Sequence, residues 1–246
     1  MTQENYMCTD AELLIEDEEL DLHVRLPFNK QGARHLFYPE GQRKAEMFYD
    51  KGVLHGPSLF FSPAQQLLAE TWYVHGKKTG KVKYYYASGK MASLQRFKEG
   101  ISEGVQQYWY EEGTVKSLIP YAQGALHGEV QLFWESGKLK RSCTYSKGVK
   151  EGWDRLYNEA HILIDEGEFS KGQPIGTHRH FFSDGKVQRE LVYHSPMRFD
   201  QREWDTSGKL VCEGVYAPDL TYIERKFLEP TRIRKGYWDG QRLCWK

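Results

Sequence analysis

The segment from Phe97 to Gly113 reads FKEGISEGVQQYWYEEG, and its pattern returns along most of the chain. An aromatic residue is followed three positions later by a glycine and four positions after that by a second glycine. Both patterns recur every 24 residues, which identifies an internal repeat. The columns are Tyr49, Tyr73, Phe97, Tyr121, Tyr145, Phe169 and Tyr193 for the aromatic, Gly52, Gly76, Gly100, Gly124, Gly148 and Gly172 for the first glycine, and Gly56, Gly80, Gly104, Gly128, Gly152 and Gly176 for the second.

Each unit has the pattern of a β-hairpin. Residues 91–97 alternate in the way of a half-buried strand, and residues 105–110 supply the return strand. Gly100 closes a tight turn that needs a positive φ, and Gly113 ends the turn into the next unit. The sequence therefore predicts an all-β chain: an elongated single-sheet meander of stacked β-hairpins.

The second glycine of each unit needs a separate explanation. Folding the hairpin at the first glycine brings the second near the preceding aromatic, diagonally across the strand pair. We expect the missing side chain to leave a slot over which that ring lies, so that Gly104→Val would be strongly destabilising.

Both ends depart from the repeat and are expected to be caps, because stacked hairpins bury their apolar stripe only against neighbours. We divide the chain into an acidic cap with a degenerate hairpin (1–35), the hairpin array (36–210) and a basic cap (211–246). Residues 9–20 have the pattern of a short helix that starts with a capping box. Leu220, Ile223 and Phe227 predict a second helix, ended by Pro230, and Asp239-Gly240 predicts a final two-residue hairpin turn.

Composition narrows the classes of function. The chain has 246 residues, with Lys+Arg 34 against Asp+Glu 34, so no overall positive charge favours nucleic acid. A mean hydropathy of −0.71 and the lack of a long apolar stretch argue against a transmembrane helix. The first residues lack a basic segment followed by an apolar one, so we expect a cytoplasmic protein, with delivery by a non-Sec secretion route as the alternative.

No set of residues predicts catalysis or a cofactor. Cys8, Cys143, Cys212 and Cys244 are scattered and lack the spacing of a zinc site, so we interpret them as small apolar residues rather than a thiol nucleophile or a disulfide. His178 and His180 share one strand face, but no third metal ligand lies nearby in the sequence. We predict no enzyme, no cofactor and no metal.

The repeat unit resembles the MORN repeat, and is most similar to its bacterial variant type. The residues that carry the resemblance are Phe97, Gly100 and Gly104, followed by the aromatic run Tyr108–Tyr110 and the turn at Gly113. It extends over about residues 36–210. The resemblance implies an array of β-hairpins that binds partners, in some cases as antitoxin-like components or as scaffolds beside membranes, with no shared catalytic residues.

Variation between units indicates where a partner would bind. The central units carry additional aromatic residues where other units have small or polar ones, a composition typical of binding hot spots. These residues are Tyr84, Tyr86, Tyr108, Tyr110 and Trp134. A second packed face, closed by self-association or by curvature of the sheet, is the alternative interpretation.

Charge is unevenly distributed although the total is zero. The first 21 residues are acidic, and the last 22 are basic. Contact with anionic lipid or an acidic partner is one interpretation, and solvated caps that protect the sheet edges are the other. The basic candidates are Arg225, Lys226, Arg232, Arg234 and Lys235.

The leading functional hypothesis is a non-enzymatic scaffold that binds another protein through its central aromatic face. One alternative is a membrane-associated scaffold that binds anionic lipid by its basic end. A second is a glycan- or choline-binding repeat module.

Overall fold

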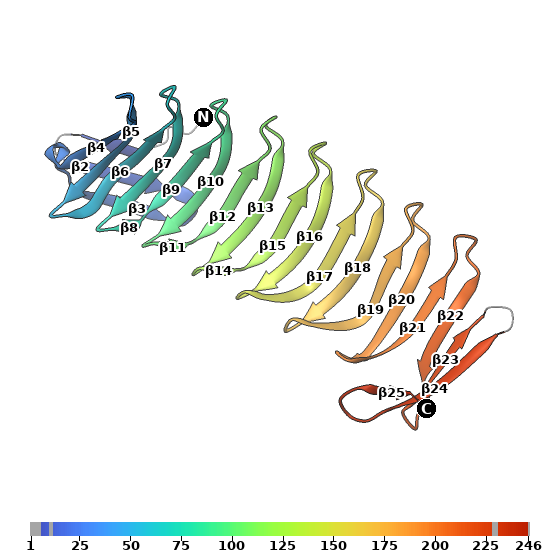
Figure 1. Ribbon diagram of the computed structural model, residues 1–246. Coiled ribbons are helices and arrows are strands. Elements are labelled where there is room, and N and C mark those ends of the chain that lie inside the picture. The colour runs from blue at the N-terminus through green and yellow to red at the C-terminus, as the bar shows by residue number, and fades with distance from the viewer. Residues whose placement is uncertain (1–5, 10–11, 228–230, 246) are drawn as a thin grey trace. The chain divides into compact units, whose positions relative to one another are not determined.

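The computed structural model describes residues 6–9, 12–227 and 231–245, and is built almost entirely of antiparallel strands (Figure 1). The chain forms two compact units, Met1–Gly128 and Glu129–Lys246. In each unit consecutive strands pair as hairpins, so the predicted all-β meander is confirmed. No helix of the described residues has the length and apolar character needed to cross a membrane.

The first unit contains fourteen described strands and two short 3-10 helices. The strands are β1 (Tyr6–Cys8), β2 (Glu12–Asp17), β3 (Leu22–Pro27), β4 (Ala33–Phe37), β5 (Arg43–Asp50), β6 (Val53–Phe61), β7 (Leu67–Val74), β8 (Lys77–Lys78), β9 (Gly80–Tyr85), β10 (Met91–Lys98), β11 (Ile101–Ser102), β12 (Gly104–Trp109), β13 (Val115–Ala122) and β14 (Ala125–Leu126). The 3-10 helices are η1 (Glu18–Leu20) and η2 (Lys30–Gly32).

The second unit continues the same hairpin pattern. Its strands are β15 (Gly128–Phe133), β16 (Leu139–Ser146), β17 (Val149–Tyr157), β18 (Leu163–Ser170), β19 (Gln173–Phe181), β20 (Val187–Ser195), β21 (Arg198–Trp204), β22 (Leu210–Tyr216), β23 (Thr221–Lys226), β24 (Arg232–Trp238) and β25 (Leu243–Trp245).

The first glycine of the repeat closes a two-residue turn, as predicted. Glu99 and Gly100 have φ values of 51° and 84°, and the equivalent turns at Lys51-Gly52 and Lys171-Gly172 share this geometry. Two consecutive positive φ values are the mark of a type I′ turn, whose twist matches that of the flanking strands. The repeat therefore sets the hairpins through its turn chemistry.

The slot predicted at the second glycine is wrong. Gly104 lies opposite Tyr121 of the following repeat. A Cβ placed on Gly104 would meet Leu20 and Arg96 rather than the ring of Phe97. Its φ of 70° follows an interruption of the return strand at Glu103, whose N–H bonds back to the Arg96 carbonyl. The second glycine is thus required by the backbone of a β-bulge, where a left-handed conformation favours glycine.

The two predicted terminal helices are also wrong. The stretch from Glu12 to Asp17 is strand β2, and only η1 follows it as one helical turn; Asp10 and Ala11 of the expected capping box lie outside the described residues. Residues 221–226 form strand β23 rather than a helix, and Pro230 also lies outside the described residues. Alternating burial in both segments shows that strand pairing prevailed over local helical spacing.

The last hairpin forms where the sequence predicted it, but with a longer loop. Strands β24 and β25 pair at Trp238 and Leu243, and the Asp239 N–H donates to the Arg242 carbonyl at 3.1 Å. Two further backbone amides, those of Gln241 and Arg242, donate to the Asp239 carboxylate. This carboxylate explains why four residues close the loop instead of the expected two.

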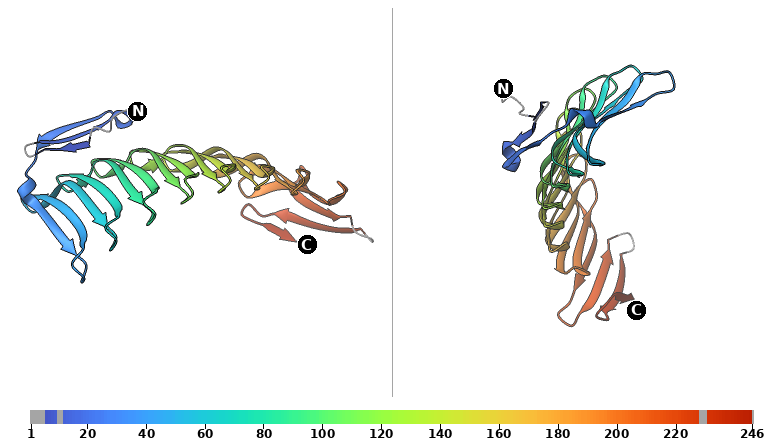
Figure 2. Two further views of the ribbon diagram at one scale, coloured as in Figure 1. Left: turned by 90° about the horizontal axis from the view of Figure 1, so that it is seen from above. Right: turned by 90° about the vertical axis from the view of Figure 1, so that its left-hand side faces the viewer.

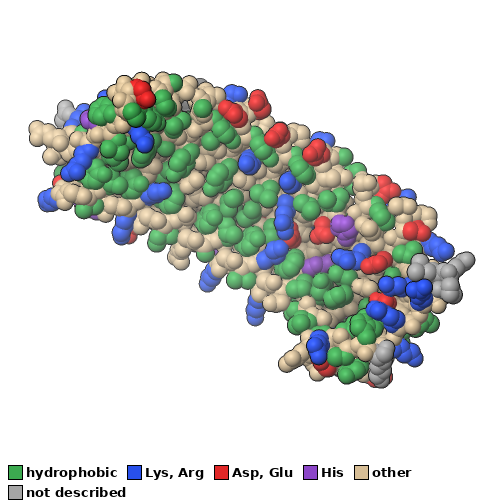
Figure 3. Space-filling view, in the orientation of Figure 1, with side chains coloured by type: hydrophobic (Ala, Val, Ile, Leu, Met, Phe, Trp, Pro, Cys, Tyr) green, Lys and Arg blue, Asp and Glu red, His purple; other side chains and the backbone are tan. Residues whose placement is uncertain are grey.

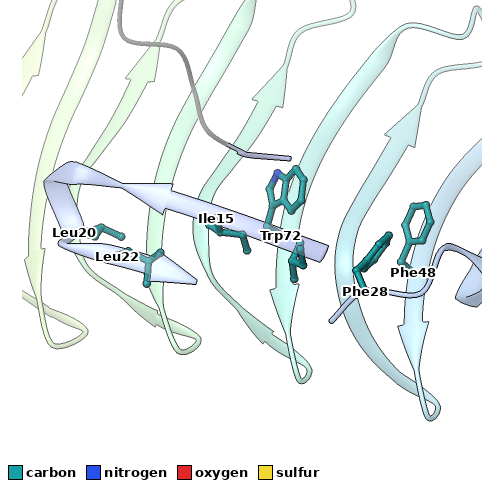
Figure 4. Packing of buried hydrophobic residues seen from close by; sticks show 7 residues of the cluster. Ile15, Leu20, Leu22, Phe28, Phe48 and Trp72 are labelled. Carbon is teal, nitrogen blue, oxygen red and sulfur yellow. The ribbon is translucent and has the colours of Figure 1, made fainter. Parts of the chain in front are cut away.

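One face of the first unit's hairpin sheet is covered by the chain's own N-terminal segment. Strands β1, β2 and β3 form a separate three-stranded sheet that lies over it (Figure 2). Leu13 and Ile15 of β2, fully buried, pack with Phe48 and Trp72 of the larger sheet (Figure 4). We call the side of the hairpin sheet that carries Phe48, Trp72 and Arg96 the covered face, and the opposite side the open face.

A buried ion pair fixes the N-terminal segment to the covered face. Arg96, only 3% exposed, lies 3.6 Å from the Asp17 carboxylate and 2.7 Å from that of Glu19. The same guanidinium donates to the Val105 carbonyl. Because Arg96 and Asp17 are both buried, their contact specifies where η1 must lie as well as holding it there.

In the second unit a ladder of charges crosses seven consecutive strands. Six ion pairs of 3.0 to 4.0 Å join arginine and glutamate side chains alternately from β17 to β23. The members are Arg155, Glu166, Arg179, Glu190, Arg202, Glu213 and Arg225. All are partly exposed, so each pair is expected to contribute at most about 1 kcal/mol.

Candidate interaction face

The open face of the first unit is built from alternate residues of each hairpin. Since Phe48 and Trp72 point to the covered face, their neighbours Tyr49 and Tyr73 point to the other side. The aromatic column predicted from the repeat therefore lies on the open face.

A second column of rings joins the first because of how the strands pair. Tyr84 lies opposite Ala69 on one side and Ser93 on the other, and Tyr108 lies opposite Ser93 and Ser117. Ala69, Ser93 and Ser117 are buried, which we attribute to the tyrosine rings on the opposing strands. The sequence placed Tyr84 and Tyr108 among the candidates, and the structure puts both on the open face.

The two columns meet as a cluster of phenols. We call Tyr73, Tyr84, Tyr108 and Tyr121 the tyrosine cluster. Burial and the neighbouring phenols of Tyr84 and Tyr49 raise the pKa of Tyr73, and burial with the phenols of Tyr121 and Tyr84 raises the pKa of Tyr108. The Tyr73 and Tyr108 hydroxyls are therefore neutral at physiological pH and offer hydrogen bonds beside apolar ring surface.

A shallow groove runs beside this cluster. Its volume is about 330 Å³, and Tyr108, Ser93, Ser117 and Ile119 of the open face line it together with Tyr86. Space-filling atoms of the first unit show apolar side chains over much of the face turned to the viewer (Figure 3). Aromatic rings at the edge of a groove are the usual anchors of protein interfaces.

The remaining aromatic candidates lie at the loop ends of the hairpins, and two of them hydrogen-bond to the next repeat. The Tyr86 hydroxyl donates to the Trp109 carbonyl at 2.7 Å, and Nε1 of Trp134 donates to the Tyr157 carbonyl at 3.3 Å. Tyr110 lies under the Lys116 ammonium, 5.4 Å from the ring centroid. Sequence reasoning grouped these residues with Tyr84 and Tyr108, whereas the structure places them in a separate row.

This row leads to a test of its structural role. Tyr86→Phe is expected to lower the free energy of unfolding by about 1 kcal/mol, because the Trp109 carbonyl loses its donor. Tyr84→Phe is the control, because the Tyr84 hydroxyl makes no such carbonyl contact among the described residues. This variant should leave the free energy of unfolding nearly unchanged. Urea denaturation of both variants measures the difference; equal values would contradict a bridging role for Tyr86.

The second unit keeps the aromatic column, at Tyr145, Phe169 and Tyr193, but lacks tyrosine at the positions equivalent to Tyr84 and Tyr108 and has charged groups among its strands. Asp154 accepts a bidentate pair of hydrogen bonds from Arg141, at 2.8 and 2.7 Å, and a third from Lys150 at 2.6 Å. His180 lies 3.1 Å from the Asp165 carboxylate. Figure 3 shows histidine and acidic side chains close together on this unit.

Acid should weaken the Asp154 network. Burial raises the pKa of Asp154, but the hydrogen bonds from Arg141 and Lys150 outweigh it and hold the pKa below its ordinary 3.8. The network therefore stabilises the fold above that pH and is lost as the pH falls through the lower, folded-state pKa. Asp154→Asn is expected to cost about 2 kcal/mol at pH 7 and to reduce the loss on acidification.

Urea titrations at a series of pH values test this expectation. Asp165→Asn serves as the matched control, because its carboxylate is 55% exposed and contacts only His180 among the ion pairs of the described residues. An unchanged acid sensitivity in Asp154→Asn would show that the network does not carry this pH dependence.

The histidine and cysteines singled out from the sequence lie in structural environments where they are described. The His178 ring packs over Gly167 and between Phe169 and Tyr193, and its Nε2 lies 2.8 Å from the Glu168 carbonyl. Burial raises the thiol pKa of Cys143 and Cys212, which makes both poor nucleophiles. No group of three potential ligands that could hold a metal occurs within residues 6–9, 12–227 and 231–245. The side chain of Cys8 is not described.

The five basic candidates divide between the two sides of the β23–β24 hairpin. Cross-strand pairing puts Lys226 opposite Arg232 and Glu224 opposite Arg234, while Arg225 and Lys235 belong to the other side. Arg225 pairs with Glu213 of the charge ladder, and Arg234 lies 3.3 Å from Glu224. The structure therefore does not gather these residues into one basic patch.

Comparison with known proteins agrees with the repeat. The MORN repeat variant family matches residues 78–99, 102–123 and 126–147, three consecutive units at the 24-residue spacing. No curated protein has a sequence that matches this chain.

Solved structures give only weak likenesses. They include the Photorhabdus luminescens Tc holotoxin pore with the TccC3-D651A mutation (12% identity, TM-score 0.21) and two TcdB2–TccC3 crystal structures, with TEV and with Cdc42 (11% identity and TM-score 0.21 for both). The matches cover 94%, 86% and 84% of this chain but 14%, 14% and 13% of those chains. A TM-score of this size supports no inference about function.

Proposed function

We propose that this chain, which carries MORN repeats of the variant type, is a non-enzymatic scaffold that binds another protein through the open face of its first unit. MORN repeats are modules for protein or membrane interaction, and the finer choice of a protein partner rests on one observation. The tyrosine cluster borders a groove on the open face, while the opposite face is occupied by the N-terminal segment.

The chemistry of the open face favours a protein partner over the two alternatives. Neutral phenols beside apolar rings supply large rigid contact area and hydrogen bonds at low entropic cost, as protein interfaces require. Anionic lipid would need gathered positive charge, but the C-terminal basic residues lie on two sides and pair with Glu213 and Glu224. Glycans also stack on tyrosine rings, so they remain the nearer competitor.

Affinity capture with matched variants tests the proposal. The full chain, a Tyr84→Ala/Tyr108→Ala variant and a Trp153→Ala control would each be used to capture proteins from lysate of the source organism, after circular dichroism shows that all are folded. Trp153 is an exposed aromatic of the second unit, 37% exposed. We expect a protein that the wild type and the control retain and the double variant loses.

Other outcomes lead to the alternatives. Retention by the double variant would remove the tyrosine cluster as the binding site. Where nothing binds the wild type, flotation with phosphatidylserine vesicles at low and high salt tests lipid binding, and a glycan array tests sugar binding.

A further inference from the structure

A second groove of the first unit lies between β3 and the turns of the hairpin sheet. Its volume is about 450 Å³. One wall is the continuous run from Leu22 to Leu26, and the other is formed by Val74, His75, Lys77, Thr79, Lys98 and Glu99. Successive side chains of a strand point to opposite faces, so five consecutive lining residues mean that the groove follows the edge of β3.

The edge of β3 on this side has no strand partner. In the described residues the order of the small sheet is β1-β2-β3, and β3 pairs only with β2. Alternate residues of such an edge direct their N–H and C=O groups outward, where an incoming strand can pair with them. Figure 4 shows the β2–β3 hairpin lying across the strands of the hairpin sheet.

The groove has a floor and a rim of different chemistry. Leu22, Val24 and Leu26 point toward the hairpin sheet, as their burial shows, and Val74 adds to this apolar floor. His23 and Arg25 are exposed on the other side of β3. A strand added beside β3 would therefore place one set of alternate side chains on apolar surface and the other next to Arg25.

Charge at the groove favours an acidic occupant. Three basic residues and one acidic residue line the groove, namely Arg25, Lys77 and Lys98, and Glu99. Lys77 lies 3.6 Å from Glu99, with both side chains largely exposed, so this pair is weak and its lysine remains accessible to an approaching carboxylate.

The chain itself shows which strand β3 accepts on its other edge. Strand β2 reads ELLIED, with Leu13 and Ile15 buried beneath it and Glu12 at 3.9 Å from Arg25. The free edge of β3 presents the same alternation of apolar and basic side chains. A strand with apolar residues at the buried positions, as at Leu13 and Ile15 of β2, and acidic residues on its outer side, as at Glu12 and Glu16, is thus complementary to it.

We propose that the free edge of β3 binds an extended segment of a partner protein, in which acidic and apolar residues alternate, by strand addition in this groove. Main-chain hydrogen bonds supply the register, the apolar residues pack on Val24 and Val74, and the acidic residues lie beside Arg25 and Lys77. This site is separate from the tyrosine cluster and does not depend on the function proposed for it.

The probe is a fluorescent peptide of about nine alternating glutamate and valine residues, used with the full chain. Anisotropy is expected to show salt-sensitive binding, and the Arg25→Glu/Lys77→Glu variant should weaken it at least about tenfold. Both side chains are more than half exposed, so the variant should fold. Lys186→Glu/Lys209→Glu, which reverses two exposed turn lysines of the second unit, and Tyr84→Ala/Tyr108→Ala should bind as the wild type does.

Backbone methylation separates strand addition from simple charge attraction. Two peptides, N-methylated at even or at odd positions, block opposite edges of the added strand, so one should lose binding and the other keep it. Hydrogen exchange of residues 22–26 should slow on binding of the unmodified peptide. The proposal is overturned if the peptide does not bind, if both methylated peptides bind equally, or if the Arg25→Glu/Lys77→Glu variant binds unchanged.

Discussion

Gly56→Ala is expected to lower the free energy of unfolding by about 3 kcal/mol. Gly56 has a φ of 111°, a conformation that residues with a side chain rarely adopt. A Cβ there would lie 2.5 Å from the Phe28 ring and 3.3 Å from Cβ of Phe48, both in the buried cluster under the N-terminal segment. Backbone strain and displaced core packing therefore add.

Gly52→Ala is the matched control for this substitution. Gly52 also has a positive φ, 84°, but no atom lies within 4 Å of the position that its Cβ would take. Strain alone should cost about 1 kcal/mol there. Urea denaturation followed by tryptophan fluorescence measures both variants, and hydrogen exchange over residues 43–61 localises the effect. Equal losses would mean that contact with Phe28 contributes nothing.

Arg96→Leu is expected to release the N-terminal segment from the covered face. Leucine removes the buried guanidinium that faces the Asp17 carboxylate, which is 3% exposed, and loss of one member of a buried ion pair typically costs about 3 to 5 kcal/mol. The cost should fall mainly on η1 and the β2–β3 hairpin, because these elements bring the carboxylates to Arg96. Limited proteolysis is expected to cleave residues 12–27 much faster than in the wild type.

Two further variants make this result interpretable. Asp17→Asn/Arg96→Leu also removes the buried carboxylate charge that Arg96 faces in the wild type and should recover part of the lost stability. Arg202→Leu, in the half-exposed charge ladder, should cost no more than about 1 kcal/mol. If Arg96→Leu proved as mild as Arg202→Leu, the ion pair would not be what holds the N-terminal segment.

The sequence by itself determined the hairpins. Turn residues such as Glu99-Gly100 specify a type I′ turn locally, and strand alternation needs only neighbours in the chain, so the 24-residue period was sufficient to predict the meander. The aromatic column and the candidates Tyr84 and Tyr108 were visible for the same reason, since a repeat places equivalent residues at equivalent positions.

Tertiary structure decided where the faces and edges lie. The helix predicted from the spacing of Leu220 and Ile223 does not form, because strands on both sides of β23 supply hydrogen-bond partners to its backbone. Tyr86 and Trp134 lie in a different row from Tyr84, because they donate hydrogen bonds to carbonyls of the next repeat, 23 residues away. Contacts over such distances depend on strand register, which local residue spacing does not contain.

That the N-terminal segment covers one face of the hairpin sheet could not be predicted from the sequence. Arg96 and Asp17 are 79 residues apart, and nothing in either local pattern marks them as partners. Burial of Leu13 and Ile15 against Trp72 brings them together, and it leaves the opposite face of the hairpin sheet open. The repeat fixed the hairpins through local geometry, whereas long-range packing decided which of their faces the N-terminal segment covers.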